Sequence, residues 1–175
     1  TGFGPLGMGI IFEQAGRTLA ASPLFSTSCL GASLILELGS EKQKEALLPK
    51  IAGGELLLAL AHEETSHHNP SHIATIAHRD GDAFVLTGEK RMVLDGHIAD
   101  KLIVVARSSG ATHEKEGISL FLVDANAPGV TVTRTSMVDS RNSAIVSLDN
   151  VRVSADHLLG DVGAGFVSLE KTLDL

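Results

Sequence analysis

The sequence has no tryptophan and no tyrosine, and phenylalanine, with six residues, is its only Phe/Trp/Tyr-type aromatic. Proteins that bind nucleic acids usually stack bases on aromatic side chains and attract the phosphate backbone with basic surfaces. Here 21 acidic side chains outnumber 14 basic ones, which gives a formal net charge of −7. The missing stacking platforms and the acidic balance argue against nucleic-acid binding.

Cysteine and long apolar runs are also scarce. Cys29 is the single cysteine, which excludes an internal disulfide and any zinc site built from several cysteines. It lies among helical apolar residues, so we interpret it as packing rather than as a nucleophile. No stretch approaches the roughly 18 apolar residues of a membrane span, and no basic segment precedes an apolar run at the N-terminus. These absences predict a globular, intracellular protein of the cytoplasm without a membrane span.

The length of 175 residues suffices for about one domain or for pieces of two. The sequence begins with Thr1 rather than with methionine, and it stops at Leu175 inside a helical pattern. We therefore expect a piece of a longer chain, in which residues outside this sequence contribute to function.

Helical periodicity covers the first part of the sequence, from Leu6 to about Lys50. Within it, Ser40–Gln43 has the capping-box pattern, in which the first residue caps a helix and the fourth bonds back to it. This pattern predicts that a helix begins here, and we expect that helix to end before Gly53.

Short β-rich runs separated by turn residues follow, from Glu55 to about Val153. Runs of this length and spacing predict an antiparallel sandwich or barrel. The polar stretch Ser108–Gly117 is predicted to be an exposed hairpin tip. Helical periodicity returns after Gly165, so the fold class is α+β rather than alternating βαβ. The runs are Leu56–Ala61, Ile73–His78, Phe84–Leu86, Arg91–Leu94, Leu102–Ala106, Ile118–Val123, Val130–Arg134 and Ala144–Leu148.

Histidines are dense after the first β-rich run, at His62, His67, His68, His72 and His78. The segment from His62 to His67 resembles the zinc motif H-E-x-x-H but is one residue too long, because positions i and i+5 of a helix do not share a face. In a loop, two of these histidines could bind a metal adventitiously. We predict instead a polar loop, with some histidines facing solvent and no functional metal site. The neighbouring carboxylates of Glu63 and Glu64 are interpreted as a solvated edge rather than an acid/base pair.

Four motifs occur in order along almost the whole sequence, at Gly39–Lys44 with Leu48–Glu55, at Gly81–Lys90, at Asp149–Ser154 and at Gly160–Phe166. They are similar to G-[ST]-E-x-Q-K…LP-x-[LI]-A-x-G-E, GD-x-[YFW]-[VI]-[LI]-x-G-x-K, [DE]-x-V-x-VP and G-x-x-G-x-G-[FWY]. Each motif alone is weak, but their order and spacing resemble the acyl-CoA dehydrogenase family.

The resemblance implies three parts: residues 1–53 as the end of an N-terminal helical domain, 54–157 as a middle β-domain of barrel or sandwich type, and 158–175 as the start of a C-terminal helical domain. It implies FAD-dependent α,β-dehydrogenation of an acyl-CoA thioester, in which a carboxylate removes the α-proton and the β-hydride passes to the flavin. The family's base lies in the C-terminal bundle, so no catalytic residue is assigned here, and Glu170 lies too early. The family also implies an acyl-CoA substrate, electron-transfer flavoprotein or another electron acceptor, and a homo- or hetero-oligomer.

The two flavin motifs are where this sequence departs from the family. The first, T-E-P-G-A-G-S-D, aligns without gaps with residues 62–69 and keeps only its Glu, as Glu63. The second, [WF]-I-[TS]-N-G, corresponds to residues 92–96, where Met92 replaces the aromatic residue and Leu94 replaces the hydroxyl residue. The resemblance implies cofactor contacts at Ala61, His62, Glu63, His68, Met92, Val93 and Leu94.

Two interpretations of these departures stay open. In the first, flavin binds, backbone groups at 61–63 and 92–94 contact its polar edge, and Met92 packs on its ring. In the second, the chain is a flavin-poor or non-catalytic partner in a heteromeric enzyme, similar to some acyl-CoA dehydrogenases of steroid breakdown. Two lost hydroxyl contacts at about 1 kcal/mol each weaken binding, and His67 in place of glycine hinders close backbone approach. A rival from another class is a non-enzymatic β-domain used only for assembly.

Overall fold

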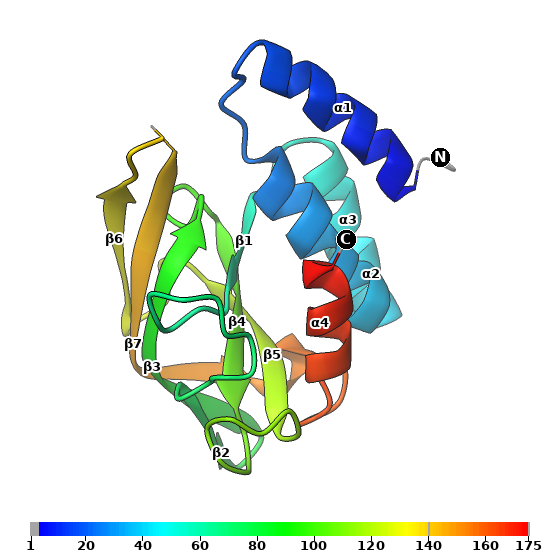
Figure 1. The fold of residues 1–175 in the computed structure, drawn as a ribbon. Helices are drawn as coiled ribbons and strands as arrows, with labels where there is room; N and C mark the ends of the chain where they lie inside the picture. Colours follow the sequence, from blue (N-terminus) through cyan, green and yellow to red (C-terminus); the bar gives the residue numbers. More distant parts are fainter. Residues whose placement is uncertain (1–3, 140, 175) are drawn as a thin grey trace.

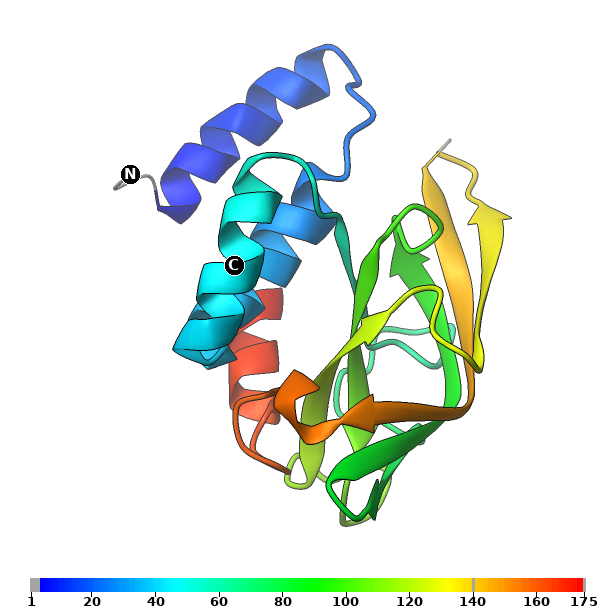
Figure 2. The ribbon, with the colours of Figure 1, turned by 180° about the vertical axis from the view of Figure 1, so that it is seen from behind.

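The computed structural model describes residues 4–139 and 141–174, and in it a helical layer covers one side of a β-domain (Figures 1 and 2). The helices near the N-terminus are α1 (Pro5–Arg17), the π-helical segment η1 (Phe25–Ala32), α2 (Ser33–Leu38) and α3 (Glu41–Ala52). The last helix, α4 (Phe166–Leu173), packs against α2, so segments from the two ends of the chain meet in the helical layer. Across the described residues, no helix is both long enough and apolar enough to cross a membrane.

The start of α3 follows the predicted capping box. The hydroxyl of Ser40 accepts from the backbone N–H of Gln43 over 3.3 Å, and the side-chain oxygen of Gln43 accepts from the backbone N–H of Ser40 over 2.8 Å. Both bonds satisfy N–H groups that a helix start leaves without partners. The helix ends at Ala52, before Gly53, as the sequence predicts.

The β-domain is one sheet that bends over itself, with strand order β6-β7-β3-β2-β4-β5-β8 and β1 paired to β4. The predicted class, helices followed by a β-domain, is confirmed, but within the described residues the sheet does not close into a barrel. The strands are β1 (Leu58–Ala61), β2 (Ile76–Asp80), β3 (Ala83–Leu94), β4 (Lys101–Arg107), β5 (Ile118–Asp124), β6 (Val130–Ser136), β7 (Asn142–Ser154) and β8 (Leu158–Leu159).

Two features of the sheet differ from the prediction. The runs expected at Phe84–Leu86 and Arg91–Leu94 form one long strand, β3, which keeps pairing with β7 across two register shifts. The sheet is also mixed rather than antiparallel, because β1 pairs with β4 in parallel and β2 meets β4 in a parallel pair. A parallel pair needs a long connection, and the β2–β3 hairpin with its flanking loops supplies one between β1 and β4.

The strands β4 and β5 are buried on both faces. On β4, Ile103 and Val105 face the cluster that includes Leu34 and Ile35 of α2. Their neighbour Val104 faces the second cluster, between β4 and the β3–β7 pair. Burial on both faces explains why β4 and β5 are continuous apolar runs instead of alternating ones.

Candidate functional site

The two segments with predicted cofactor contacts meet beside the end of β1, where the loop of residues 62–75 begins. The backbone N–H of Arg91 donates to the carbonyl oxygen of Glu63 over 2.8 Å. The ammonium of Lys90 donates to the carbonyl oxygen of His62 over 3.2 Å. The start of the loop therefore lies against β3 at the position of its second register shift.

A buried ion pair holds this arrangement. The side chain of Lys90 is fully buried, and its Nζ lies 2.6 Å from Oε1 of Glu64. The Glu64 carboxylate also accepts from the backbone N–H groups of Ala74 and Thr75, over 2.6 and 2.9 Å. The pair thus joins both ends of the 62–75 loop to β3. The prediction of a solvated carboxylate edge is wrong for Glu64, because a buried lysine needs a buried partner.

Both members of this pair have displaced pKa values. Burial lowers the pKa of Lys90 to about 8, although the charge of Glu64 acts in the opposite direction. Burial by itself raises the pKa of Glu64, but the charge of Lys90 and the hydrogen bonds to the carboxylate bring the pKa below its ordinary 4.5. Lys90 and Glu64 are therefore an ion pair near neutral pH.

Three side chains converge at the beginning of the loop. His62 Nε2 lies 3.1 Å and His68 Nδ1 lies 2.5 Å from the same oxygen, Oε1 of Glu63. Burial lowers the pKa of His62 more than the nearby Glu63 raises it, which favours the neutral imidazole. The segment is a loop rather than a helix, so His67 points elsewhere and its Nδ1 lies 3.1 Å from the hydroxyl of Ser66. The structure therefore brings His62 together with His68 and not with His67.

Met92 lies in the bulge of β3, at a φ of +52°, where the register against β7 shifts between Lys90 and Val93. A left-handed backbone is uncommon for residues other than glycine, so the surrounding structure must hold it. The Met92 side chain is 50% exposed, whereas Val93 is 1% exposed and points into the sheet. Ala61 is likewise fully buried. Ala61 and Val93 are therefore covered as whole residues, whereas Met92 is open to a ligand.

Leu94 lines a mainly apolar cavity of about 420 Å³ between the helical layer and the ends of β3 and β7. Phe12 and Phe25 contribute two rings to the lining, with their centroids 5.9 Å apart. Next to Leu94, the Asp95 carboxylate accepts from the hydroxyl of Ser26 over 2.7 Å, which fixes η1 to the end of β3. The cavity suits an apolar group held beside Leu94.

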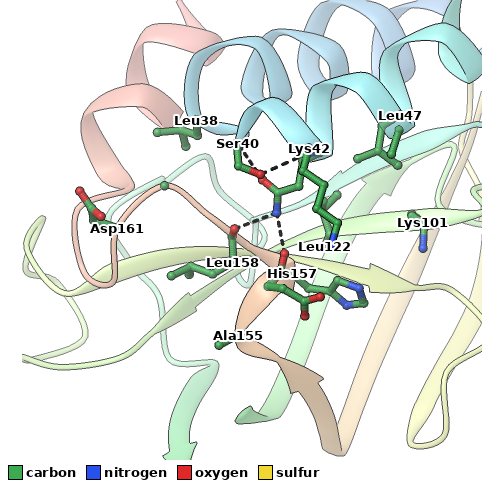
Figure 3. Close-up of a pocket in the computed structure, with 14 residues that line it drawn as sticks. Leu38, Ser40, Lys42, Leu47, Lys101, Leu122, Ala155, His157, Leu158 and Asp161 are labelled. Atoms are coloured by element: carbon green, nitrogen blue, oxygen red, sulfur yellow. Dashed lines mark hydrogen bonds between the residues drawn. The ribbon is translucent and has the colours of Figure 1, made fainter. Parts of the chain in front are cut away.

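A larger cavity, of about 580 Å³, lies between the start of α3 and the segment after β7, the 3-10 turn η2 (Ala155–His157) and β8 (Figure 3). The side-chain amide of Gln43 donates to the carbonyl oxygens of Asp156 and Leu158, over 2.8 and 3.0 Å, and ties α3 to this segment. The lining of this larger cavity includes two lysines, Lys42 and Lys101. This cavity is lined by other residues than the predicted cofactor contacts.

The sequence did not single out Arg107, which ends β4 and is 6% exposed. Its guanidinium joins the 62–75 loop to the 108–117 connection, which is the predicted hairpin between β4 and β5. The signal available in the sequence was a lone arginine at the end of an apolar strand. The carbonyl oxygens that accept from it, over 2.8 to 3.4 Å, belong to Ser71, Ile73, Ser109, Thr112, Glu114 and Glu116.

Comparison with known families identifies the class to which this fold and site belong. The model of the acyl-CoA dehydrogenase N-terminal domain matches residues 1–55, and the model of the acyl-CoA dehydrogenase middle domain matches residues 59–151. Together these matches cover most of the sequence. The chain belongs to the acyl-CoA dehydrogenase family.

Individual relatives agree with this assignment. The chain is 32% identical over 180 aligned residues to the cyclohex-1-ene-1-carbonyl-CoA dehydrogenase of Geobacter metallireducens, with 99% of this chain and 47% of the relative covered. It is 31% identical over 173 residues to the 3-(aryl)acrylate reductase of Clostridium sporogenes, with 94% and 45% covered. The chain therefore spans about half the length of the curated relatives it matches.

Solved structures share the fold. Butyryl-CoA dehydrogenase from Megasphaera elsdenii superposes with a TM-score of 0.80 at 29% identity, over 87% of this chain and 41% of that one. The ChsE4-ChsE5 complex from Mycobacterium tuberculosis contains a chain that superposes with a TM-score of 0.84 at 24% identity, over 96% of this chain and 44% of that one.

Proposed function

We propose that this chain is the N-terminal and middle part of an FAD-dependent acyl-CoA dehydrogenase. The reaction removes two hydrogens from an acyl-CoA thioester: a base outside this chain takes the α-proton, and the β-hydride leaves for the flavin. The observation that carries the proposal is the contact between the loop start at His62 and Glu63 and the β3 bulge at Met92. These are the two segments that hold the flavin motifs in the family.

The residues at this contact fit a flavin ring. The exposed thioether of Met92 offers an apolar, polarisable surface that a ring can cover, while Ala61 and Val93 are buried. His62, Glu63, His68 and Leu94 complete the proposed contacts. FAD, when bound here, supplies the hydride acceptor. The chain's own part is to orient that group and to exclude water from it.

The cavity beside Leu94 supports the choice of an acyl substrate. Leu94, two residues after Met92, is part of its lining, and Phe12 and Phe25 give it apolar walls that suit an acyl chain or an alicyclic ring. We place the reaction in the cytoplasm, in an oligomer of like or unlike subunits. Electron-transfer flavoprotein or another acceptor then reoxidises the cofactor.

A second candidate function is a flavin-poor subunit of a heteromeric acyl-CoA dehydrogenase. It is favoured by Leu94, which offers no hydroxyl where the family bonds the flavin. His67 at a family glycine position, with an exposed side chain, favours it as well. In that case the flavin chemistry belongs to a partner chain, and this chain contributes to assembly and to the substrate pocket.

The absorbance spectrum of the purified full-length protein separates the two candidates. We expect the visible bands of bound flavin, and we expect an acyl-CoA substrate to bleach them under anaerobic conditions while an enoyl-CoA forms. A colourless protein that takes up no added FAD contradicts the first candidate. If such a protein forms a complex with a flavin-containing partner, the second candidate is supported instead.

Replacing Met92 by tryptophan is expected to tighten FAD binding by about 2- to 10-fold, because a stacked aromatic pair adds roughly 0.5–1.5 kcal/mol beyond area burial. The measurement is a titration of the FAD-free protein followed by flavin fluorescence. Met92→Leu is the matched control, and it should leave the affinity nearly unchanged because it adds no ring. Unchanged or weaker binding by the tryptophan variant means that Met92 does not lie at the flavin ring.

A further inference from the structure

His62, Glu63 and His68 are among the proposed FAD contacts, but the dehydrogenation itself does not need their side chains to converge on one another. Their ligand atoms, one from each side chain, lie within 4.8 Å of one another. The three side chains come from one short stretch of loop just after β1, and the buried pair of Glu64 and Lys90 holds that stretch in place. The cluster is thus built on a fixed part of the backbone.

The distances suit a small metal ion. Zinc binds histidine nitrogen and carboxylate oxygen at about 2.0–2.2 Å, so two ligands in a tetrahedral shell lie about 3.3 Å apart. His62 Nε2 and Glu63 Oε1 are already 3.1 Å apart. His68 Nδ1, at 2.5 Å from the same oxygen, must move outward by less than about 1 Å, which its 66% exposed side chain allows.

The Nε2 atom of His62 is available to bind an ion. This nitrogen is buried, and among the described residues no group forms a hydrogen bond with it. It lies 3.1 Å from Oε1 of Glu63, but this contact does not have the geometry of a hydrogen bond. Buried polar atoms normally have partners, and an ion between the two side chains would supply one.

The surroundings meet two further requirements of a metal site. The second carboxylate oxygen of Glu63, Oε2, accepts from the backbone N–H of Asn69 over 3.4 Å, which orients the ligand. His68 lies at the surface, so an ion can enter from solvent, while His62 and Glu63 are 14% and 12% exposed and bind from within.

We propose that His62 Nε2, Glu63 Oε1 and His68 Nδ1 bind a divalent transition-metal ion such as Zn²⁺. Three protein ligands leave at least one position of the ion open to water. These three residues are also proposed FAD contacts, whereas the exposed thioether of Met92 takes no part in the metal site. Metal binding is therefore measured on the FAD-free protein, so that its result does not depend on flavin binding.

The test is a titration of the full-length, chelator-treated protein with Co²⁺, followed by its d–d absorbance, and with Zn²⁺ by calorimetry. We expect one ion per chain. His68→Ala and Glu63→Gln should each weaken binding by at least about 10- to 100-fold, the loss that removal of even an outer-shell partner causes. His68→Ala is the safer of the two for folding, because its side chain is mostly exposed, and circular dichroism checks both variants.

Two controls locate the ion. His67→Ala removes a histidine from the same loop and should leave the affinity unchanged. His72 and His113 form a second pair, with their Nδ1 atoms 3.3 Å apart, and the double alanine variant should also bind normally. The proposal is overturned if the protein binds no ion, if His68→Ala and Glu63→Gln bind like the wild type, or if the His72/His113 variant loses the ion. A protein that binds the ion but not FAD contradicts the proposed function and leaves the metal site standing.

Discussion

Replacing Lys90 by methionine is expected to destabilise the protein by about 3–5 kcal/mol, the range for removing one partner of a buried ion pair. The variant leaves the Glu64 carboxylate buried without a counter-charge, and it removes the bond from the ammonium to the carbonyl oxygen of His62. Because the same pair fastens the 62–75 loop to β3, the loop should loosen together with the loss of global stability.

Urea unfolding of the wild type and the variant measures this effect. Lys171→Met is the matched control: Lys171 pairs with Glu37 over 3.0 Å, but both side chains are exposed, so the cost should stay below about 1 kcal/mol. The double variant Lys90→Met/Glu64→Gln should regain part of the stability, because its glutamine carries no charge. If Lys90→Met is as mild as the control, the buried pair does not hold the loop.

The same pair predicts a pH dependence. Between about pH 8 and 10.5 the unfolded chain still holds a proton that folded Lys90 has lost, so this group makes the free energy of unfolding rise with pH. Below pH 4.5 the low pKa of folded Glu64 makes the wild type lose stability as the pH falls. The stability difference between wild type and Lys90→Met should therefore widen from pH 8 to 10.5 and narrow in acid. A constant difference would contradict these pKa shifts.

Replacing Arg107 by methionine is expected to cost about 3 kcal/mol or more, since charge-assisted hydrogen bonds contribute about 1.5–3 kcal/mol each and buried carbonyl groups lose their donor. The guanidinium serves both the 62–75 loop and the 108–117 connection, so one substitution frees two surface segments. Lysine at this position keeps the charge but not the planar guanidinium fork, so Arg107→Lys should recover only a minor part of the stability that Arg107→Met loses.

Thermal unfolding measures the global effect of Arg107→Met, and amide hydrogen exchange should rise within 62–75 and 108–117. Arg134→Met is the control: Arg134 is exposed on β6, and within the described residues its side chain bonds only to that of Asn142, so the change in stability should be less than about 0.5 kcal/mol. Unchanged exchange in both segments would show that Arg107 does not join them.

Local patterns in the sequence predicted the elements whose reasons are local. The capping box at Ser40 and Gln43 forms as predicted, because its four residues contain both partners of both hydrogen bonds. The apolar runs of β4 and β5 predicted strands, and they are strands because burial on both faces requires such runs. The long strand β3 was split in the prediction, because nothing between Leu86 and Arg91 reveals that β7 bridges the irregularity.

Some features of the site follow from the sequence alone, and others follow only from the tertiary structure. Residue identity alone placed the chain in its family and marked Met92 and Leu94 as departures from the flavin motifs. In the structure Lys90 continues the inward-facing alternation of Phe84 and Leu86, but the predicted run ended at Leu86, so the buried lysine was not predicted.

Only the tertiary structure decided which groups meet. It chose Glu64 rather than Glu63 as the partner of Lys90, and it set His68 rather than His67 beside His62. The physical reason is that loop backbone has no fixed period, so the directions of its side chains follow from the long-range bonds that fasten the loop. Those bonds come from β3, through Lys90, and from β4, through Arg107.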